Sequence, residues 1–231
     1  MKSTGNDIVA LKAIDKQRTN LPRFYSKILS LSEQALYYRQ GFGEMPFEKF
    51  VWLLWSVKES VYKYMKRSMP ALVFSPTKII IQGIDPPYRR TITIFGDTQW
   101  ENKSNGSCEE FYKGIIIVDS EIFYFRSKIH LELISTIVSN DENFEDIWWG
   151  IKSIDHAAYD NQSKSVRAFI LNKLNFILPG CNDNLSIGKC PSGYPVLLKG
   201  AKEMNIPVSF SHHDHFIAYS FLLEQNEELN S

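Results

Sequence analysis

The sequence predicts an α+β protein built from two similar halves that share one interface. The chain has 231 residues, of which 44% are hydrophobic and 13% aromatic, so it can bury one large core or two small cores packed together. Segments with the two-residue alternation of strands are mixed with segments of helical period. Their order in residues 113–231 repeats the order in residues 1–112, although the halves share no clear sequence identity.

In the first half, a short strand at Asp7–Leu11 precedes a helix from about Leu21 to Gln40. After a loop containing glycines, Pro46 can occupy the first turn of a long second helix, because the missing N–H of proline costs nothing there. We expect this helix to run to about Arg67. Two strands and a polar surface loop are predicted beyond it, at Lys78–Ile84, Thr91–Phe95 and Trp100–Glu110.

The second half is predicted to mix strands and helices in the same way. The strands are expected at Gly114–Val118, Glu121–Ile129, Asp146–Ile154, Pro195–Leu198 and Pro207–Leu223. The polar residues Ser211-His212-His213-Asp214 break the last of these strands with a turn. The helices are expected at His130–Val138 and Ser163–Leu174.

Charge and cysteine content limit the partners and the compartment. Lys and Arg total 26, as do Asp and Glu, so the formal net charge is zero and offers no overall attraction for nucleic acid or an anionic membrane. The three cysteines are widely spaced without a C-x-x-C pair, which suits a reducing compartment. No stretch approaches the roughly 20 apolar residues of a membrane span. We therefore expect a cytoplasmic protein without nucleic-acid or membrane partners.

The helix after Pro46 contains a charge where an apolar residue is expected. One face is an apolar stripe, and Lys58 falls within it, so its ammonium must extend to solvent or find a partner. Glu59 and Lys63 are four residues apart on the adjoining face, where both can point at the same neighbour. On spacing alone, an ordinary solvated ion pair is the commoner arrangement.

Three short motifs carry a resemblance to a known family. The segment from Trp55 to Lys63, WSVKESVYK, resembles the W-x-x-K-E-[AS]-x-x-K signature of the 4′-phosphopantetheinyl transferase superfamily. Gly5-Asn6-Asp7-Ile8-Val9 is similar to the G-x-D-[IV]-[VE] motif of its short holo-acyl-carrier-protein synthases. Ser209-Phe210-Ser211-His212 resembles the S-x-S-H strand end, and Gly193–Leu197 resembles the G-K-P-x-[LF] motif before it. The segment Tyr88–Asn161 matches no motif of the family.

This resemblance implies a magnesium-dependent transferase. Such enzymes move 4′-phosphopantetheine from coenzyme A to a serine of an acyl or peptidyl carrier protein and release 3′,5′-ADP, a reaction that depends on positioning and charge neutralisation. By resemblance, Asp7 and Glu59 are the Mg²⁺ ligands, Lys63 contacts the pyrophosphate and Lys58 orients Glu59. The base that deprotonates the serine is either Glu59 or a metal-bound water. The carrier can belong to fatty-acid, polyketide or peptide synthesis.

The resemblance also assigns Ser211 and His212 to the 3′-phosphate or ribose of coenzyme A. A polar turn between strands and a zinc site stay open as alternatives for Ser211–His215. Adjacent residues of an extended segment point to opposite faces, which disfavours zinc binding by both His212 and His213. A carrier with acidic helices would seek a basic surface, for which residues 12–23 offer Lys12, Lys16, Arg18 and Arg23. Scattered surface charges without such a role are the alternative for these four residues.

The length matches the fused, two-half members of the superfamily and implies a monomer with one site between residues 1–112 and residues 113–231. The second half has Ser165-Val166-Arg167 and no K-E pair in its helix, so no second site is expected. Two departures stand out. Glycines that commonly follow the K-E helix are missing, and Tyr194 replaces the lysine of G-K-P. Candidates for the missing charge are Lys66, Arg67, Lys189 and Lys199, with Lys164 and Arg167 as further candidates for phosphate contact.

Two rival functions also fit the sequence. One is a non-catalytic paralogue that binds a carrier protein or coenzyme A, because the missing glycines and Tyr194 could have abolished turnover. The second is a metal-dependent hydrolase built on the histidines of residues 212–215. Magnesium-dependent release of 3′,5′-ADP would separate the transferase from the paralogue, and loss of activity with a zinc chelator would favour the hydrolase.

Overall fold

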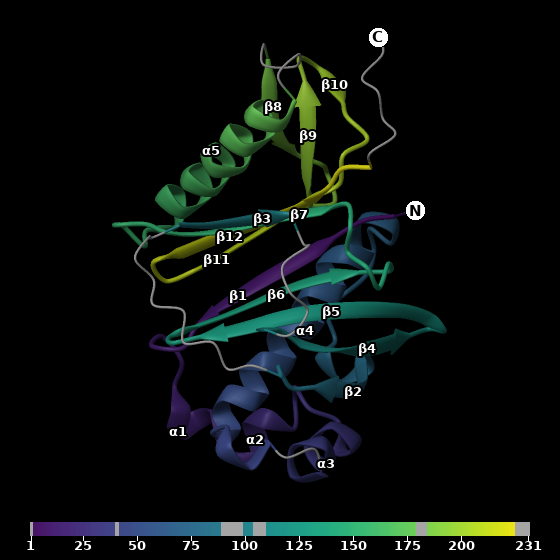
Figure 1. The fold of residues 1–231 in the computed structure, drawn as a ribbon, viewed down its shortest axis with the longest axis vertical. Coiled ribbons are helices and arrows are strands. Elements are labelled where there is room, and N and C mark those ends of the chain that lie inside the picture. The colour runs from purple at the N-terminus through teal and green to yellow at the C-terminus, as the bar shows by residue number, and fades with distance from the viewer. Residues whose placement is uncertain (1, 40–41, 89–98, 104–109, 179–183, 225–231) are drawn as a thin grey trace.

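Two antiparallel sheets stacked face to face form the centre of the molecule (Figure 1). The computed structural model describes residues 2–39, 42–88, 99–103, 110–178 and 184–224. The strand order of the first sheet is β1 (Gly5–Ala10), β6 (Leu133–Ser139), β5 (Glu121–His130), β4 (Tyr112–Val118) and β2 (Ile80–Asp85). The second sheet has the order β11 (Val208–His213), β12 (Phe216–Leu222), β7 (Ile147–Ser153) and β3 (Gln99–Lys103). The predicted α+β class is confirmed.

Helices cover the outer faces of the two sheets (Figure 1). The long helix α4 (Phe47–Ser68) packs on the first sheet, and its buried stripe includes Phe50, Leu54, Val57 and Val61. Three short helices lie near it: α1 (Lys16–Thr19), α2 (Pro22–Tyr25) and α3 (Leu31–Arg39). Helix α5 (Tyr159–Ile177) packs on the second sheet, together with a small sheet of β8 (Leu185–Lys189), β9 (Pro195–Lys199) and β10 (Lys202–Glu203).

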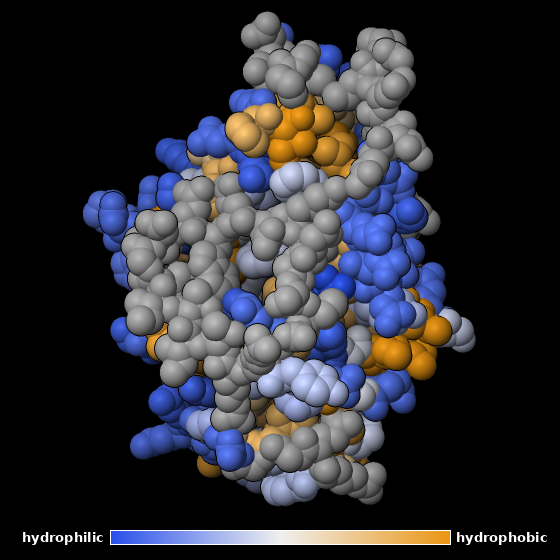
Figure 2. Space-filling model, viewed as in Figure 1, coloured by the Kyte–Doolittle hydropathy of each residue, from blue (hydrophilic) through white to orange (hydrophobic). Residues whose placement is uncertain are grey.

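A third apolar cluster joins the two sheets. It includes Ile8, Leu133 and Ile137 from the first sheet and Trp149, Ile151 and Ala218 from the second. At β4 and β5, the face of the first sheet opposite α4 is less covered, since Ile115, Ile117 and Ile122 are exposed there. Figure 2 shows an apolar cluster on this face where β4 turns into β5. Among the described residues, no helix combines the length and apolar character needed to cross a membrane.

Most predicted elements form, with shifts at their ends. Helix α4 begins directly after Pro46, which is its N-cap, and ends where the Met69 N–H donates to the Met65 carbonyl at 2.8 Å. The single helix expected at residues 21–40 is two helices, α2 and α3, with the buried residues Ile28 and Leu29 between them, and Ser30 caps the start of the second. The turn expected at residues 211–214 lies at Asp214 and His215, so Ser211, His212 and His213 belong to β11. The predicted strand Thr91–Phe95 lies outside the described residues.

Two predictions of element type are wrong. Residues 133–139 form the strand β6 and not part of a helix. Six of these seven residues are buried, since α4 covers one face of the sheet and the second sheet covers the other, and a strand buried on both faces loses its alternation. Residues 100–103, expected in a surface loop, belong to the edge strand β3, which pairs with β7.

The sheets do not follow the division expected between residues 112 and 113. Strand β4 begins at the division and β5 and β6 follow it, yet all three belong to the first sheet. Strand β3 precedes the division but belongs to the second sheet. Among the described cysteines, Cys190 is a free, partly buried thiol.

Candidate functional site

The Gly5–Val9 motif on β1 lies against the Trp55–Lys63 motif on α4 because the strand approaches the helix closely at Gly5. A Cβ atom added there would overlap the backbone carbonyl oxygen of Ser60 on α4. Only glycine permits this approach without moving the strand. Two residues further along β1, Asp7 then faces the side of α4 that carries Glu59 and Lys63.

The Lys63 ammonium bridges two carboxylates. Its Nζ lies 2.9 Å from Asp7 Oδ1 and 3.3 Å from Glu59 Oε1. The side chain of Asp7 is 7% exposed, whereas those of Lys63 and Glu59 are 23% and 28% exposed. The predicted group of Asp7, Glu59 and Lys63 therefore comes together, with Glu59 more accessible than Asp7.

Burial dominates the electrostatics of Asp7. It raises the pKa of the Asp7 carboxyl from 3.8 to about 7, although the neighbouring Lys63 acts in the opposite direction. Burial lowers the pKa of Lys63, but Asp7 and Glu59 outweigh it, and the pKa of Lys63 lies above its ordinary value. Because two carboxylates share a single ammonium, the site can accept a further cation.

The two carboxylates fit a magnesium ion. Asp7 Oδ2 is buried and has no hydrogen-bond partner among the described residues, and an unpaired buried carboxylate oxygen is costly. Magnesium is usually held by one or two carboxylates, with waters and substrate phosphates as the other ligands. A structural zinc site needs four protein ligands, and the part of the chain that the structure describes contains no group of three or more His, Cys, Asp or Glu side chains able to hold a metal.

Strand β11 brings the Ser209–His212 motif next to β1. The Asn6 N–H donates to Ser209 Oγ at 3.1 Å, and Asn6 Nδ2 donates to Ser211 Oγ at 3.0 Å. Further along, the Ala10 N–H donates to His213 Nδ1 at 3.2 Å, which makes that nitrogen the unprotonated one. These bonds fix the relative position of the two sheets.

A cavity of about 430 Å³ opens between α4 and the second half of the chain. Five cations line it, Lys63, Lys66 and Arg67 from α4, Arg167 from α5 and Lys189 from β8. Among the described residues, no aspartate or glutamate lines the cavity. In a chain of zero formal net charge, this is a strong local excess of positive charge, and it suits a ligand with several negative charges.

Of the two β11 residues predicted to bind coenzyme A, His212 lines the cavity and Ser211 does not appear among its described lining residues. His212 lines the cavity, and its ring lies edge-on to that of Tyr159 at 5.4 Å. Burial, followed by the charge of Lys63, lowers the pKa of His212. Ser211 is buried and hydrogen-bonded to Asn6, and it is not among the described residues that line the cavity. Ser209 lines it instead.

Only some of the cations predicted to contact phosphate lie at the cavity. Lys66, Arg67, Lys189 and Arg167 line the cavity, whereas Lys199 and Lys164 do not appear among its described lining residues. Arg167 is held by a bond from Nη1 to the Ile187 carbonyl at 2.6 Å, with its guanidinium over the Phe210 ring.

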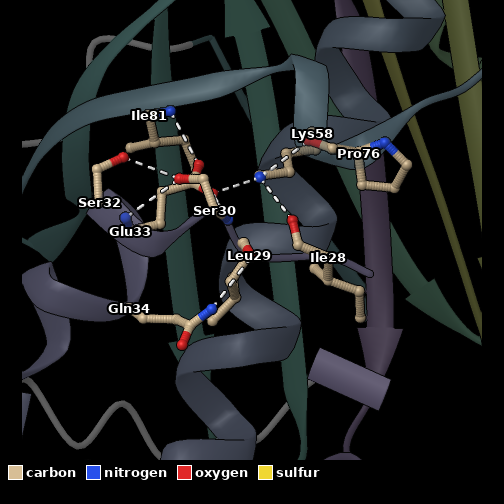
Figure 3. A network of polar contacts seen from close by, with 9 residues as sticks. All are labelled: Ile28, Leu29, Ser30, Ser32, Glu33, Gln34, Lys58, Pro76 and Ile81. Atoms are coloured by element: carbon tan, nitrogen blue, oxygen red, sulfur yellow. Dashed lines mark hydrogen bonds and ion pairs between the residues drawn. The ribbon is translucent and has the colours of Figure 1, made fainter. Parts of the chain in front are cut away.

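The structure does not bring Lys58 to this site. Its buried ammonium donates to Glu33 Oε2 at 2.6 Å and to the carbonyls of Ile28 and Pro76 at 2.7 and 3.0 Å (Figure 3). These three bonds use all three ammonium hydrogens. Lys58 therefore joins α4 to α3 and to the segment before β2, whereas Glu59 pairs with Lys63.

Glu33 is a residue that the sequence motifs did not single out. It accepts from the Ile81 N–H at 3.0 Å and from the Ser30 N–H at 2.8 Å (Figure 3). The Glu33 N–H donates in turn to Ser30 Oγ at 3.2 Å. This reciprocal pair is a capping box, and the spacing S-x-x-E at residues 30–33 was a signal that could have identified it. The sequence has no comparable signal for Tyr159 and Ser163, which reach the cavity from α5.

The basic residues considered for carrier binding lie on and near α1 and α2. Lys12 pairs with Glu132 at 2.6 Å, and both side chains are exposed. The Arg18 guanidinium lies 5.1 Å from the centre of the Phe24 ring.

Residues 3–116 match the family model of the 4′-phosphopantetheinyl transferase superfamily. The matched segment contains Asp7, Glu59 and Lys63, and it ends within β4, before β11 and its histidines. No curated protein and no solved structure matches the chain.

Proposed function

Because residues 3–116 place this chain in the 4′-phosphopantetheinyl transferase superfamily, we propose that it is a magnesium-dependent holo-acyl-carrier-protein synthase. Transfer of phosphopantetheine is the activity of the superfamily, and coenzyme A and a carrier protein are the partners that it implies. The further proposal is that the chain moves 4′-phosphopantetheine to a carrier serine, in fatty-acid synthesis or a related pathway, and releases 3′,5′-ADP.

The observation that carries this proposal is that the carboxylate site and the basic cavity meet at Lys63. The Asp7–Lys63–Glu59 group can hold a metal ion and a phosphate, and Lys63 also lines the cavity with four more cations and no described carboxylate. Coenzyme A carries a pyrophosphate and a 3′-phosphate, so a cation-rich cavity that begins at a two-carboxylate site matches the charges of this substrate.

In the proposed reaction, the serine Oγ forms a bond to the β-phosphorus of coenzyme A while the bond from that phosphorus to the bridging oxygen of 3′,5′-ADP breaks. The serine proton passes to a base. Glu59 is suited to this role because it is the more exposed of the two carboxylates and Lys63 holds it at 3.3 Å.

Asp7 and Glu59 would hold Mg²⁺, which when bound supplies positive charge to the pyrophosphate. Lys63 can donate to the leaving phosphate oxygens, where its charge offsets the charge that builds up as the bond breaks. The other cations of the cavity orient the nucleotide, which brings the reacting atoms together.

We also infer that the chain is a monomeric pseudodimer with its boundary between Ser139 and Ile147. Each proposed unit begins with a strand, β1 or β7, continues with a long helix, α4 or α5, and ends with a strand that pairs antiparallel with the first, β6 or β12. This shared order supports a duplicated unit with one cavity between its copies.

The test is Mg²⁺-dependent release of 3′,5′-ADP from coenzyme A in the presence of an apo carrier protein. We expect release that stops when either Mg²⁺ or the carrier is left out. Coenzyme A binding without release, for every carrier tried, would contradict catalysis and identify a non-catalytic coenzyme A-binding protein instead.

A further inference from the structure

Arg67 is a partly buried cation on helix α4. It lies on α4 one turn beyond Lys63, and its Nη2 donates to the carbonyls of Val208 and Pro195 at 2.8 and 3.0 Å. Burial lowers the pKa of Arg67 and outweighs Tyr194 and Glu203, which act in the opposite direction. No carboxylate of the described residues forms an ion pair with the guanidinium. A desolvated cation without a counter-charge is costly, and the cavity that Arg67 lines gives an anion access to it.

Tyr194 fixes the position of this guanidinium. The Arg67 side chain lies over the Tyr194 ring, 4.9 Å from its centre, an arrangement that favours a cation. The ring is itself held by a tight turn, in which the Gly193 N–H donates to the Cys190 carbonyl and the Cys190 N–H donates to the Tyr194 carbonyl. Gly193 has a φ of +95° in this turn, which favours glycine. Arg67 is thus restrained by groups of the second half although it belongs to α4.

The position of Arg67 along α4 indicates which phosphate it meets. Lys63 marks the reacting pyrophosphate, because it bridges the two carboxylates. Four residues of helix separate the Cα atoms of Lys63 and Arg67 by about 6 Å along the axis. In coenzyme A the phosphate that lies apart from the pyrophosphate is the one on the 3′ position of the ribose.

We propose that Arg67, positioned by Tyr194, binds the 3′-phosphate and makes this chain select nucleotides that carry it. The inference rests on the proposed function for the identity of the substrate, but not for the test. Tyr194 occupies the position where the resembling motif has a lysine. In this chain the positive charge comes from α4 instead, and the tyrosine holds it in place.

The experiment compares two nucleotides by calorimetry, 3′,5′-ADP and 5′-AMP, which lacks the 3′-phosphate. Neither a carrier protein nor Mg²⁺ is needed. Wild-type protein should prefer 3′,5′-ADP, and Arg67→Gln, which keeps donors for the two carbonyls but removes the charge, should weaken 3′,5′-ADP binding by about 10- to 100-fold. Binding of 5′-AMP should change less than about threefold. The matched control is Lys199→Ala, outside the described lining of the cavity, which should bind like wild type.

The positioning role of Tyr194 has its own variants. Tyr194→Ala should lose the preference for 3′,5′-ADP, whereas Tyr194→Phe, which keeps the ring, should retain it. In the double variant Arg67→Gln/Tyr194→Lys, the new ammonium should restore part of the preference. Retention of the full preference by Tyr194→Ala would overturn the positioning role.

Two results would overturn the binding role of Arg67. One is equal affinity of the wild-type protein for both nucleotides, and the second is an equal loss for both in Arg67→Gln, which would indicate a merely structural residue. Failure of the proposed function looks different, since the chain would then retain selective nucleotide binding without any transfer to a carrier.

Discussion

At the scale of single residues, Asp7 has two unlike oxygens. One accepts from Lys63 and the other is buried without a partner among the described residues. Glu59 shares the same ammonium but is more exposed. This asymmetry gives the carboxylates different proposed roles, with Asp7 as a fixed ligand for a cation and Glu59 as a ligand that can also approach a hydroxyl.

The first prediction concerns these carboxylates. Asp7→Asn and Glu59→Gln keep the size of each side chain and remove its charge, so we expect transfer to fall roughly 100-fold or more while the fold persists. Product release assays and circular dichroism measure the two effects. Lys2→Gln, which alters the exposed ion pair with Glu224, is the control and should transfer normally. Near-normal transfer by either carboxylate variant would contradict the assigned metal site.

The second prediction is a pH dependence of stability. The raised pKa of Asp7, about 7 against 3.8, means that the metal-free folded protein keeps a proton that the unfolded chain releases between these values. The stability from this group is complete below about pH 4 and is lost as the pH rises to 7. In Asp7→Asn this loss disappears. The raised pKa of Lys63 starts from 10.5, so it affects stability only at higher pH.

Thermal unfolding in a chelator tests this prediction. The Tm of Asp7→Asn minus that of the wild type should increase between pH 4 and pH 8. A difference that stays constant or decreases over this range would show that Asp7 is ionised in the metal-free fold.

At the scale of elements, buried contacts hold α4 in place. Lys58 and Glu33 are both fully buried and form an ion pair with backbone partners on several segments. Removing one member of such a pair leaves the other charge buried and unpaired.

Lys58→Met should therefore lower the free energy of unfolding by about 3–5 kcal/mol. Lys12→Met, in the exposed pair with Glu132, should lower it by less than about 1 kcal/mol. Urea denaturation of both variants measures the difference. Equal effects would mean that the Lys58 network contributes no more than a surface pair.

A second element-scale prediction concerns Gly5. Gly5→Ala forces β1 away from the Ser60 carbonyl, and overpacking of this kind costs about 1–3 kcal/mol. It should also weaken transfer, because Asp7 moves with β1. Gly83→Ala is the control, since an added Cβ meets nothing within 4 Å there. If Gly5→Ala is as stable and active as Gly83→Ala, the close approach is not what places Asp7.

Elements could be predicted where one face is buried and the other is polar. Helix α4 has this pattern and was predicted nearly to the residue, and its Glu59 and Lys63 followed from the motif. Strand β6 was missed because both of its faces are buried, and β3 because it is a polar edge strand that depends on pairing with β7. The basic cavity could not be predicted from spacing, since its residues come from α4, α5 and β8 and meet only through tertiary packing.

At the scale of the whole molecule, the two proposed units are alike in order but not in chemistry. Strand β7 contains no acidic residue where β1 has Asp7, and α5 has Ser165-Val166-Arg167 and no K-E pair. We therefore predict one nucleotide per chain. Calorimetry with 3′,5′-ADP should give a stoichiometry near one, and two equivalent sites per chain would contradict the single shared cavity.

Transfer of phosphopantetheine to a carrier protein can be followed through the intact mass of the carrier. Purified protein is incubated with coenzyme A, Mg²⁺ and several apo carriers, with Glu59→Gln as the inactive control. We predict that at least one carrier gains the mass of one phosphopantetheine group, only with Mg²⁺ and only with the wild-type enzyme. No gain on any carrier, in protein that binds coenzyme A, would contradict the proposed transferase activity.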